Sequence, residues 1–124
     1  MSKRILVVED QEDNRQILRD LLANAGYEMI EADDGEKAVA AALREHPDLI
    51  LMDIQLPEMD GYEATRRIRA VPELAKVPII AVTSYALSGD EAKTREAGCD
   101  GYIAKPFSPR QLLAKIREFL PDAA

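Results

Sequence analysis

The sequence contains no tryptophan, a single cysteine and no apolar run approaching the roughly 20 residues that span a bilayer. Because Cys99 has no second cysteine to pair with, a disulfide framework is excluded. The basic residues at the N-terminus are followed by only four apolar residues, Ile5 to Val8, which excludes a signal peptide. These absences predict a cytoplasmic protein that does not enter the membrane.

Basic residues are in the minority, with 16 Lys and Arg against 23 Asp and Glu and a formal net charge of -7. They are scattered along the chain, which argues against nucleic acid as a partner and favours a protein or a cation. No linker, repeat or low-complexity stretch divides the 124 residues. We expect a single domain over residues 1–124, with a core at about residues 3–120 and no output domain.

Short apolar runs alternate with amphipathic segments along the whole chain, which predicts alternating strands and helices. The strands are expected at residues 5–8, 27–32, 49–52, 78–82 and 101–104, each followed by a helix. The first helix carries an apolar stripe that includes Ile17, and the second places Leu43 on its inward face. Ser108 and Gln111 form a capping-box pattern that begins the last helix.

Five strand-then-helix units predict a doubly wound α/β domain, in which a five-stranded parallel sheet carries helices on both faces. The first, third and fourth strands are unbroken apolar runs and are expected at the centre. The second strand contains Glu28 and Glu31 and the short fifth strand contains Gly101, so these two are expected at the edges. The flavodoxin-like order 2-1-3-4-5 has these edges, and its switch point lies between strands 1 and 3.

Polar side chains stand at the carboxyl ends of four of the predicted strands. Glu9 and Asp10 follow the first strand, Asp53 the third, Thr83 the fourth and Lys105 the fifth. Doubly wound folds bind ligands beyond these strand ends, near the switch point. An acid at one strand end is usually a turn or helix-capping residue, but this combination is hard to attribute to turns. The set therefore predicts a functional site.

Three clustered carboxylates repel one another, so such a site either raises a carboxyl pKa or binds a hard cation. Mg²⁺ fits, because it is commonly held by one or two carboxylates together with a substrate phosphate. Lys105 offers a point charge to Asp53 or to a phosphoryl oxygen, and Thr83 offers a hydroxyl donor. The set suits phosphoryl transfer to a carboxylate, with Asp53 as the nucleophile.

Four segments resemble the receiver domain of two-component response regulators, the CheY-like superfamily, and the match covers nearly the whole chain. They are VVED at residues 7–10, DLILMDIQLPEMDG at 48–61, PIIAVT at 78–83 and GYIAKPF at 101–107. The resemblance implies that Asp53 accepts a phosphoryl group from a histidine kinase or a histidine phosphotransfer protein. It also implies that Asp10, Asp53 and the backbone carbonyl of Gln55 bind Mg²⁺, with Glu9 acting through water.

The resemblance further implies a conformational switch. On phosphorylation Thr83 turns toward the phosphoryl group and Tyr102 rotates inward in this family. The surface of the fourth helix, fifth strand and fifth helix then changes, which selects a downstream protein target. A cis peptide bond is implied between Lys105 and Pro106.

Two variable positions of this family influence how fast water removes the phosphoryl group, and here they are Gln55 and Tyr85. Tyr85 is expected to shield the site, so the resemblance leads us to expect slow self-dephosphorylation.

Within the family the chain resembles the DivK-like subfamily of stand-alone receivers, and a detached receiver domain of a hybrid histidine kinase is the alternative. A Mg-dependent aspartyl phosphatase is less favoured, because such enzymes carry a second acid two residues after the nucleophile, where this chain has Gln55. A binding module that is never phosphorylated and a flavin-binding domain are weaker alternatives. We expect a monomer or weak dimer, with no enzymatic activity beyond self-phosphorylation and self-dephosphorylation.

Overall fold

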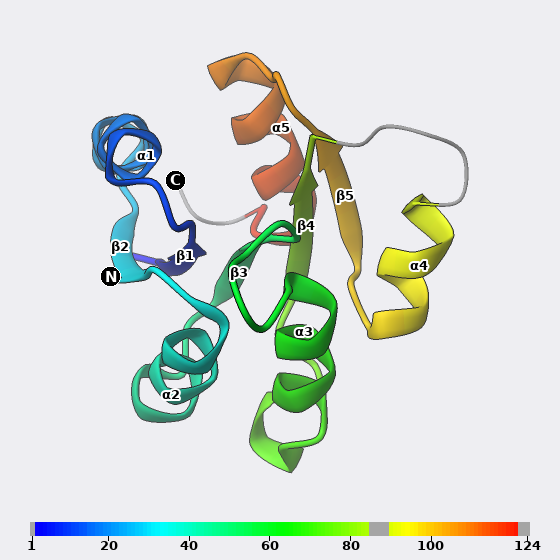
Figure 1. The fold of residues 1–124 in the computed structure, drawn as a ribbon. Coiled ribbons are helices and arrows are strands. Elements are labelled where there is room, and N and C mark those ends of the chain that lie inside the picture. Colours follow the sequence, from blue (N-terminus) through cyan, green and yellow to red (C-terminus); the bar gives the residue numbers. More distant parts are fainter. Residues whose placement is uncertain (1, 85–89, 122–124) are drawn as a thin grey trace.

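The computed structural model describes residues 2–84 and 90–121, which form one parallel sheet with helices on both faces (Figure 1). The strands are β1 (Arg4–Val8), β2 (Glu28–Ala32), β3 (Leu49–Asp53), β4 (Ile79–Thr83) and β5 (Gly101–Ala104). The helices are α1 (Glu12–Asn24), α2 (Gly35–Glu45), α3 (Gly61–Arg69), α4 (Asp90–Ala97) and α5 (Pro109–Phe119). A short 3₁₀ helix, η1 (Pro72–Leu74), lies between α3 and β4 and was not predicted.

The order of the strands in the sheet is β2-β1-β3-β4-β5, with all neighbours parallel, as the sequence predicted. Val8 pairs with Met52, and Asp53 pairs with Val82. The carboxyl ends of β1, β3 and β4 therefore lie next to one another. The chain passes from β1 to β2 on one side of β1 and then crosses back to β3 on the other side, so the switch point lies between β1 and β3.

Both faces of the sheet are buried, which explains why the central strands are unbroken apolar runs. Alternate residues such as Leu6 and Ile50 pack under α2 and α3, while Ile5 and Leu51 pack under α1 and α5. Figure 1 shows α1 and α5 together on one side of the sheet and α2 and α3 on the other. A rigid two-sided core thus supports the strand ends.

Two predictions of buried residues are wrong, because Ile17 is 64% exposed and Leu43 is 42% exposed. Helix α1 reaches full burial at Leu22. Helix α2 packs through alanines, including Ala41, and their small side chains let the helix lie close to its neighbours. A large side chain at the edge of the buried face of such a helix remains in solvent.

The beginning of α5 agrees with the sequence. The Ser108 hydroxyl accepts a hydrogen bond from the Gln111 backbone N–H at 3.1 Å, and the Gln111 side chain accepts one from the Ser108 backbone N–H at 2.7 Å. This capping box satisfies N–H groups that have no partner within the helix. Among the described residues, no helix is long and apolar enough to cross a bilayer.

Candidate functional site

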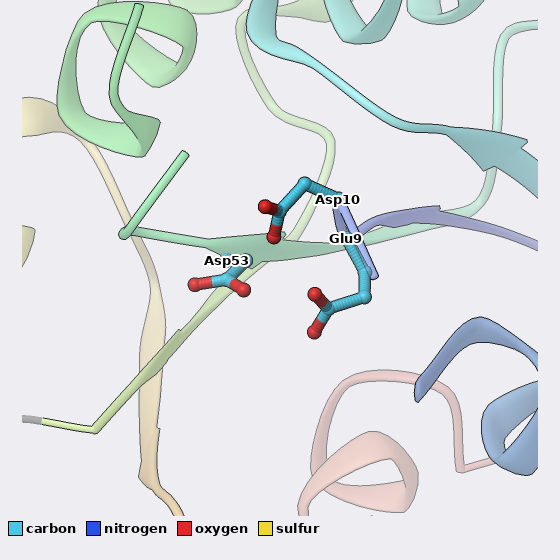
Figure 2. A group of neighbouring side chains, drawn as sticks. All are labelled: Glu9, Asp10 and Asp53. Atoms are coloured by element: carbon cyan, nitrogen blue, oxygen red, sulfur yellow. The ribbon is translucent and has the colours of Figure 1, made fainter. Parts of the chain in front are cut away.

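Three carboxylates meet at the switch point of the sheet. Glu9 and Asp10 come directly after β1, and Asp53 is the last residue of β3. One carboxylate oxygen of each lies within 4.8 Å of the others (Figure 2). Glu9 and Asp53 are each 4% exposed, whereas Asp10 is half-buried. The parallel topology therefore brings together the acids that the sequence singled out.

Lys105 completes the cluster from the end of β5. Its Nζ lies 3.1 Å from Asp53 Oδ2 and 3.2 Å from Glu9 Oε1. Its backbone N–H donates to the Thr83 carbonyl at 2.7 Å, which fixes the start of the loop that follows β5. Partial burial works to lower the pKa of Lys105, but the attraction of Asp53 and Glu9 outweighs it, so the pKa lies above its usual value. Lys105 is therefore a cation at neutral pH.

The two buried carboxylates are held in the same way. Asp53 Oδ1 accepts the Gln55 backbone N–H at 2.9 Å, and Glu9 Oε2 accepts the Gln11 backbone N–H at 3.1 Å. The remaining oxygen of each carboxylate lies against Lys105. Each carboxylate thus has one oxygen on the local backbone and the other on the shared ammonium.

The donor set fits a divalent cation. Three carboxyl groups face a single ammonium group, so acidic groups outnumber cationic groups in the cluster. Carboxylate oxygens are the ligands that Mg²⁺ prefers, and Mg²⁺ needs only one or two of them. Glu9, Asp10 and Asp53 could hold such an ion.

The other predicted site residues lie around this cluster. Thr83 ends β4 beside Asp53 and is 1% exposed, while Tyr102 is half-buried in β5, opposite Ala81. The Gln55 side-chain carbonyl accepts the Ser84 backbone N–H at 3.3 Å. This contact joins the loop after β3 to the loop after β4.

Two further expectations concern residues at the margins of the site. The peptide bond between Lys105 and Pro106 is cis, as expected. Tyr85 lies outside the described residues.

A cavity of about 670 Å³ opens onto the cluster. Its lining includes Glu9, Asp53 and Lys105 together with apolar side chains of α1 and α5, such as Leu18 and Leu112. The buried carboxylates are therefore reachable from outside the molecule.

Arg15 also touches the cluster, and sequence reasoning missed it. Its guanidinium donates to the Glu9 carbonyl oxygen at 2.7 Å. No local motif marks this contact, because Arg15 comes from the second turn of α1 and bonds to the main chain. Only the relative placement of β1 and α1 could have revealed it.

Comparisons with known proteins agree with this geometry. Residues 5–117 match the model of the response regulator receiver domain. The chain is 46% identical over 123 residues to the polar-differentiation response regulator DivK of Brucella ovis, covering 99% of this chain and 100% of DivK. The DivK of Brucella anthropi is 45% identical over the same length.

Solved structures show the same resemblance. The receiver domain of the sensor histidine kinase PA1611 from Pseudomonas aeruginosa PAO1 is 40% identical, with a TM-score of 0.91 over 98% of this chain and 100% of that chain. In that structure a magnesium ion is coordinated in the active site cleft. The chemotaxis protein CheY4 of Vibrio cholerae is 29% identical, with a TM-score of 0.92 over 96% of this chain and 99% of that chain.

The fold and the acidic site define a CheY-like signalling domain. The chain belongs to the response regulator receiver domain family of two-component phosphorelays, and within it the chain is DivK-like.

Proposed function

We propose that Asp53 is the phosphoryl acceptor of this receiver domain and that phosphorylation requires Mg²⁺. One observation carries the proposal: the oxygens of Glu9, Asp10 and Asp53 lie within 4.8 Å of one another, with Lys105 3.1 Å from Asp53. Asp53 ends the central strand β3 and lines the cavity, and the resemblance to response regulators points to this residue as the acceptor.

In the proposed reaction an Asp53 carboxylate oxygen attacks the phosphorus of a phosphohistidine. The new oxygen–phosphorus bond forms as the phosphorus–nitrogen bond breaks, and the departing imidazole takes up a proton. Lys105 neutralises charge on the phosphoryl oxygens, and the Thr83 hydroxyl donates to one of them. The rigid strand ends hold these groups in position before the donor arrives, which is the main contribution of protein to phosphoryl transfer.

Asp10, Asp53 and the backbone carbonyl of Gln55 are the proposed Mg²⁺ ligands, with Glu9 acting through water. When bound, Mg²⁺ supplies positive charge that offsets repulsion between the carboxylates and the incoming phosphoryl group.

We propose that the signal passes from the site through Thr83 and Tyr102 to the face made by α4, β5 and α5. Thr83 pairs with Ala104 in the sheet, and Tyr102 lies two residues before Ala104 on β5. A movement of Thr83 is therefore transmitted to β5 over a short distance. The altered face then selects a downstream protein, as a population shift between two packings.

The proposed phosphoryl donor is a histidine kinase or a histidine phosphotransfer protein in the cytoplasm. We propose that residues 3–120 form the one receiver domain of this chain and that it acts as a switch and not as a turnover enzyme. An aspartyl phosphatase needs a second acid where this chain has Gln55, and the Gln55 side-chain carbonyl is bonded to the Ser84 N–H. The expected slow loss of phosphate rests on Gln55 and Tyr85.

Intact-mass measurement after incubation with a small phosphodonor and Mg²⁺ tests the proposal. The wild type is expected to gain the mass of one phosphoryl group, and a chelator should prevent the gain. Asp53→Asn should gain nothing. Asp13→Asn is the matched control, because Asp13 is an exposed acid of α1 outside the cluster. An equal mass gain in Asp53→Asn would refute the assignment.

A further inference from the structure

We infer that Arg15 is a positioning residue for the metal site, because it holds the peptide unit that joins Glu9 to Asp10. The inference rests on the proposed function. Arg15 is well placed for the role, since its side chain is 13% exposed and is anchored at three points. Its guanidinium donates to the Glu9 carbonyl oxygen at 2.7 Å, while Nη2 lies 2.6 Å from Glu12 and Nε lies 3.3 Å from Glu31.

Every polar group of Glu9 is held by a different part of the fold. Its N–H donates to the Ala32 carbonyl of β2 at 3.0 Å. Its carboxylate lies against Lys105 and the Gln11 N–H. The contact from Arg15 holds the remaining group, the carbonyl oxygen. Within the described part of the chain, Arg15 is the side chain that bonds to the main chain of Glu9.

Asp10 depends on this contact more than Glu9 does. The Glu9 carbonyl belongs to the same planar peptide unit as the Asp10 N–H, so fixing that oxygen also fixes the direction in which Asp10 leaves β1. The Asp10 carboxylate itself has one partner in the described part of the chain, the Gln11 side chain at 3.3 Å. Its place beside Asp53 therefore comes from the backbone.

The effect of Arg15 is geometric more than electrostatic. Its positive charge is paired with Glu12 and Glu31, so little of it is left to stabilise the acidic cluster. The planar guanidinium makes contacts in three directions at once, which a lysine ammonium on a flexible stem does not reproduce. Residues that orient metal ligands in this way typically change metal affinity by roughly 10–100-fold when removed.

Arg19 provides a matched control on the same helix. It lies against the same two acids, 2.6 Å from Glu31 and 3.2 Å from Glu12. Its third contact is with the Gln16 side chain, whereas the third contact of Arg15 is with the Glu9 carbonyl oxygen. Losing Arg19 weakens the shared ion-pair network and leaves the Glu9 carbonyl contact in place. The two arginines therefore separate positioning of the metal site from general support of α1.

Calorimetric titration of the unphosphorylated full chain with Mg²⁺, without a phosphodonor, tests the inference. Arg15→Ala is expected to weaken Mg²⁺ binding by roughly 10-fold or more, and Arg19→Ala by less than about 2-fold. Arg15→Lys keeps the positive charge but not the planar guanidinium, so the Mg²⁺ affinity of this variant should fall between those of Arg15→Ala and the wild type. Phosphorylation of Arg15→Ala should need more Mg²⁺ for half-maximal rate and approach the wild-type rate at saturation.

Unchanged Mg²⁺ affinity in Arg15→Ala would overturn the inference, and so would equal weakening in the Arg15 and Arg19 variants. If Arg15→Ala does not fold, Arg15→Lys decides the question, because wild-type Mg²⁺ affinity in that variant contradicts a role for the guanidinium contacts. A wild type that binds no Mg²⁺ refutes the proposed function, and the inference with it. Loss of affinity confined to the Arg15 variants supports both.

Discussion

Asp10 offers a direct test of the electrostatics of the site, because it adds a charge to the acidic cluster without a cation of its own. Lys105 lies against Glu9 and Asp53, and no contact joins it to Asp10 in the described part of the chain. Asp10→Asn removes one negative charge and keeps the shape of the side chain. We expect the variant to be more stable than the wild type without Mg²⁺ and less stable with it.

The size of the gain follows from the spacing of the acids. At a separation of 4.8 Å, two unit charges repel by about 3.5 kcal/mol at an effective dielectric constant of about 20, and by about 0.9 kcal/mol in bulk water. Asp10 is half-buried and open to water, so its two repulsions lie near the lower limit and sum to about 2 kcal/mol. The ammonium of Lys105, which lies against both other acids, offsets about one of these two repulsions. The expected gain in the free energy of unfolding is about 1 kcal/mol, which corresponds to a rise of roughly 4 °C in Tm.

Urea unfolding in low-salt buffer measures both the expected gain in stability without Mg²⁺ and the expected loss with Mg²⁺. With a chelator present, Asp10→Asn should have the higher free energy of unfolding. At a Mg²⁺ concentration about 100 times Kd, binding stabilises the wild type by about 2.7 kcal/mol. The variant loses most of that increment, because one proposed ligand is now neutral. The order of the two proteins therefore reverses when Mg²⁺ is added.

Asp13→Asn controls for the change in net charge. Asp13 is exposed in the first turn of α1 and lies outside the acidic cluster. Its replacement should change the free energy of unfolding by no more than about 0.5 kcal/mol. If Asp10→Asn is no more stable than the wild type without Mg²⁺, or if Asp13→Asn gains as much, the repulsion argument is wrong.

Three other expectations follow from packing and charge. Gly61→Ala should cost about 1–3 kcal/mol in urea unfolding and slow phosphorylation, because a methyl group there falls on the Asp53 carbonyl oxygen. Ile50→Ala should cost about 2–5 kcal/mol, since Ile50 is fully buried, whereas Ile17→Ala at an exposed site should cost far less. The pKa of Lys105 is raised in the folded state, so its ion pairs stabilise the fold fully below the ordinary lysine pKa of about 10.4. That stability is lost as the pH rises further, and Lys105→Met should show a smaller loss over the same range.

The sheet was predictable because burial leaves a mark on the composition of each strand. The continuous apolar run at residues 49–52 placed β3 at the centre, and the structure extends it by one residue to Asp53. The acids of β2 placed that strand at an edge, where Glu28 and Glu31 are exposed. The helices were less predictable, because a helix face is shared between core and solvent. Leu43 shows this, since hydrophobicity alone does not distinguish a position at the edge of the buried helix face from one at its centre.

The site was predictable for the same topological reason. Parallel strands place their carboxyl ends on one edge, so acids 43 residues apart, Asp10 and Asp53, meet once the strand order is known. Contacts that depend on side-chain reach were not predictable. Lys105 was expected to pair with Asp53, but its second contact, with Glu9, depends on the length of the glutamate side chain. The Arg15 contact depends on the angle at which α1 leaves the sheet.

The two contacts of Lys105, with Glu9 and with Asp53, suggest how a change of charge at Asp53 is transmitted to β5. Lys105 lies between two carboxylates that each have a second, backbone partner, so the ammonium is the group shared between them. Under the proposed function, a phosphoryl group on Asp53 places three acceptor oxygens carrying more negative charge beside Lys105. We propose that Lys105 then strengthens its contact with the phosphorylated Asp53 and weakens its contact with Glu9. Lys105 directly follows β5, the edge strand that carries Tyr102, so this exchange of contacts would reinforce the proposed effect of Thr83 on the same strand.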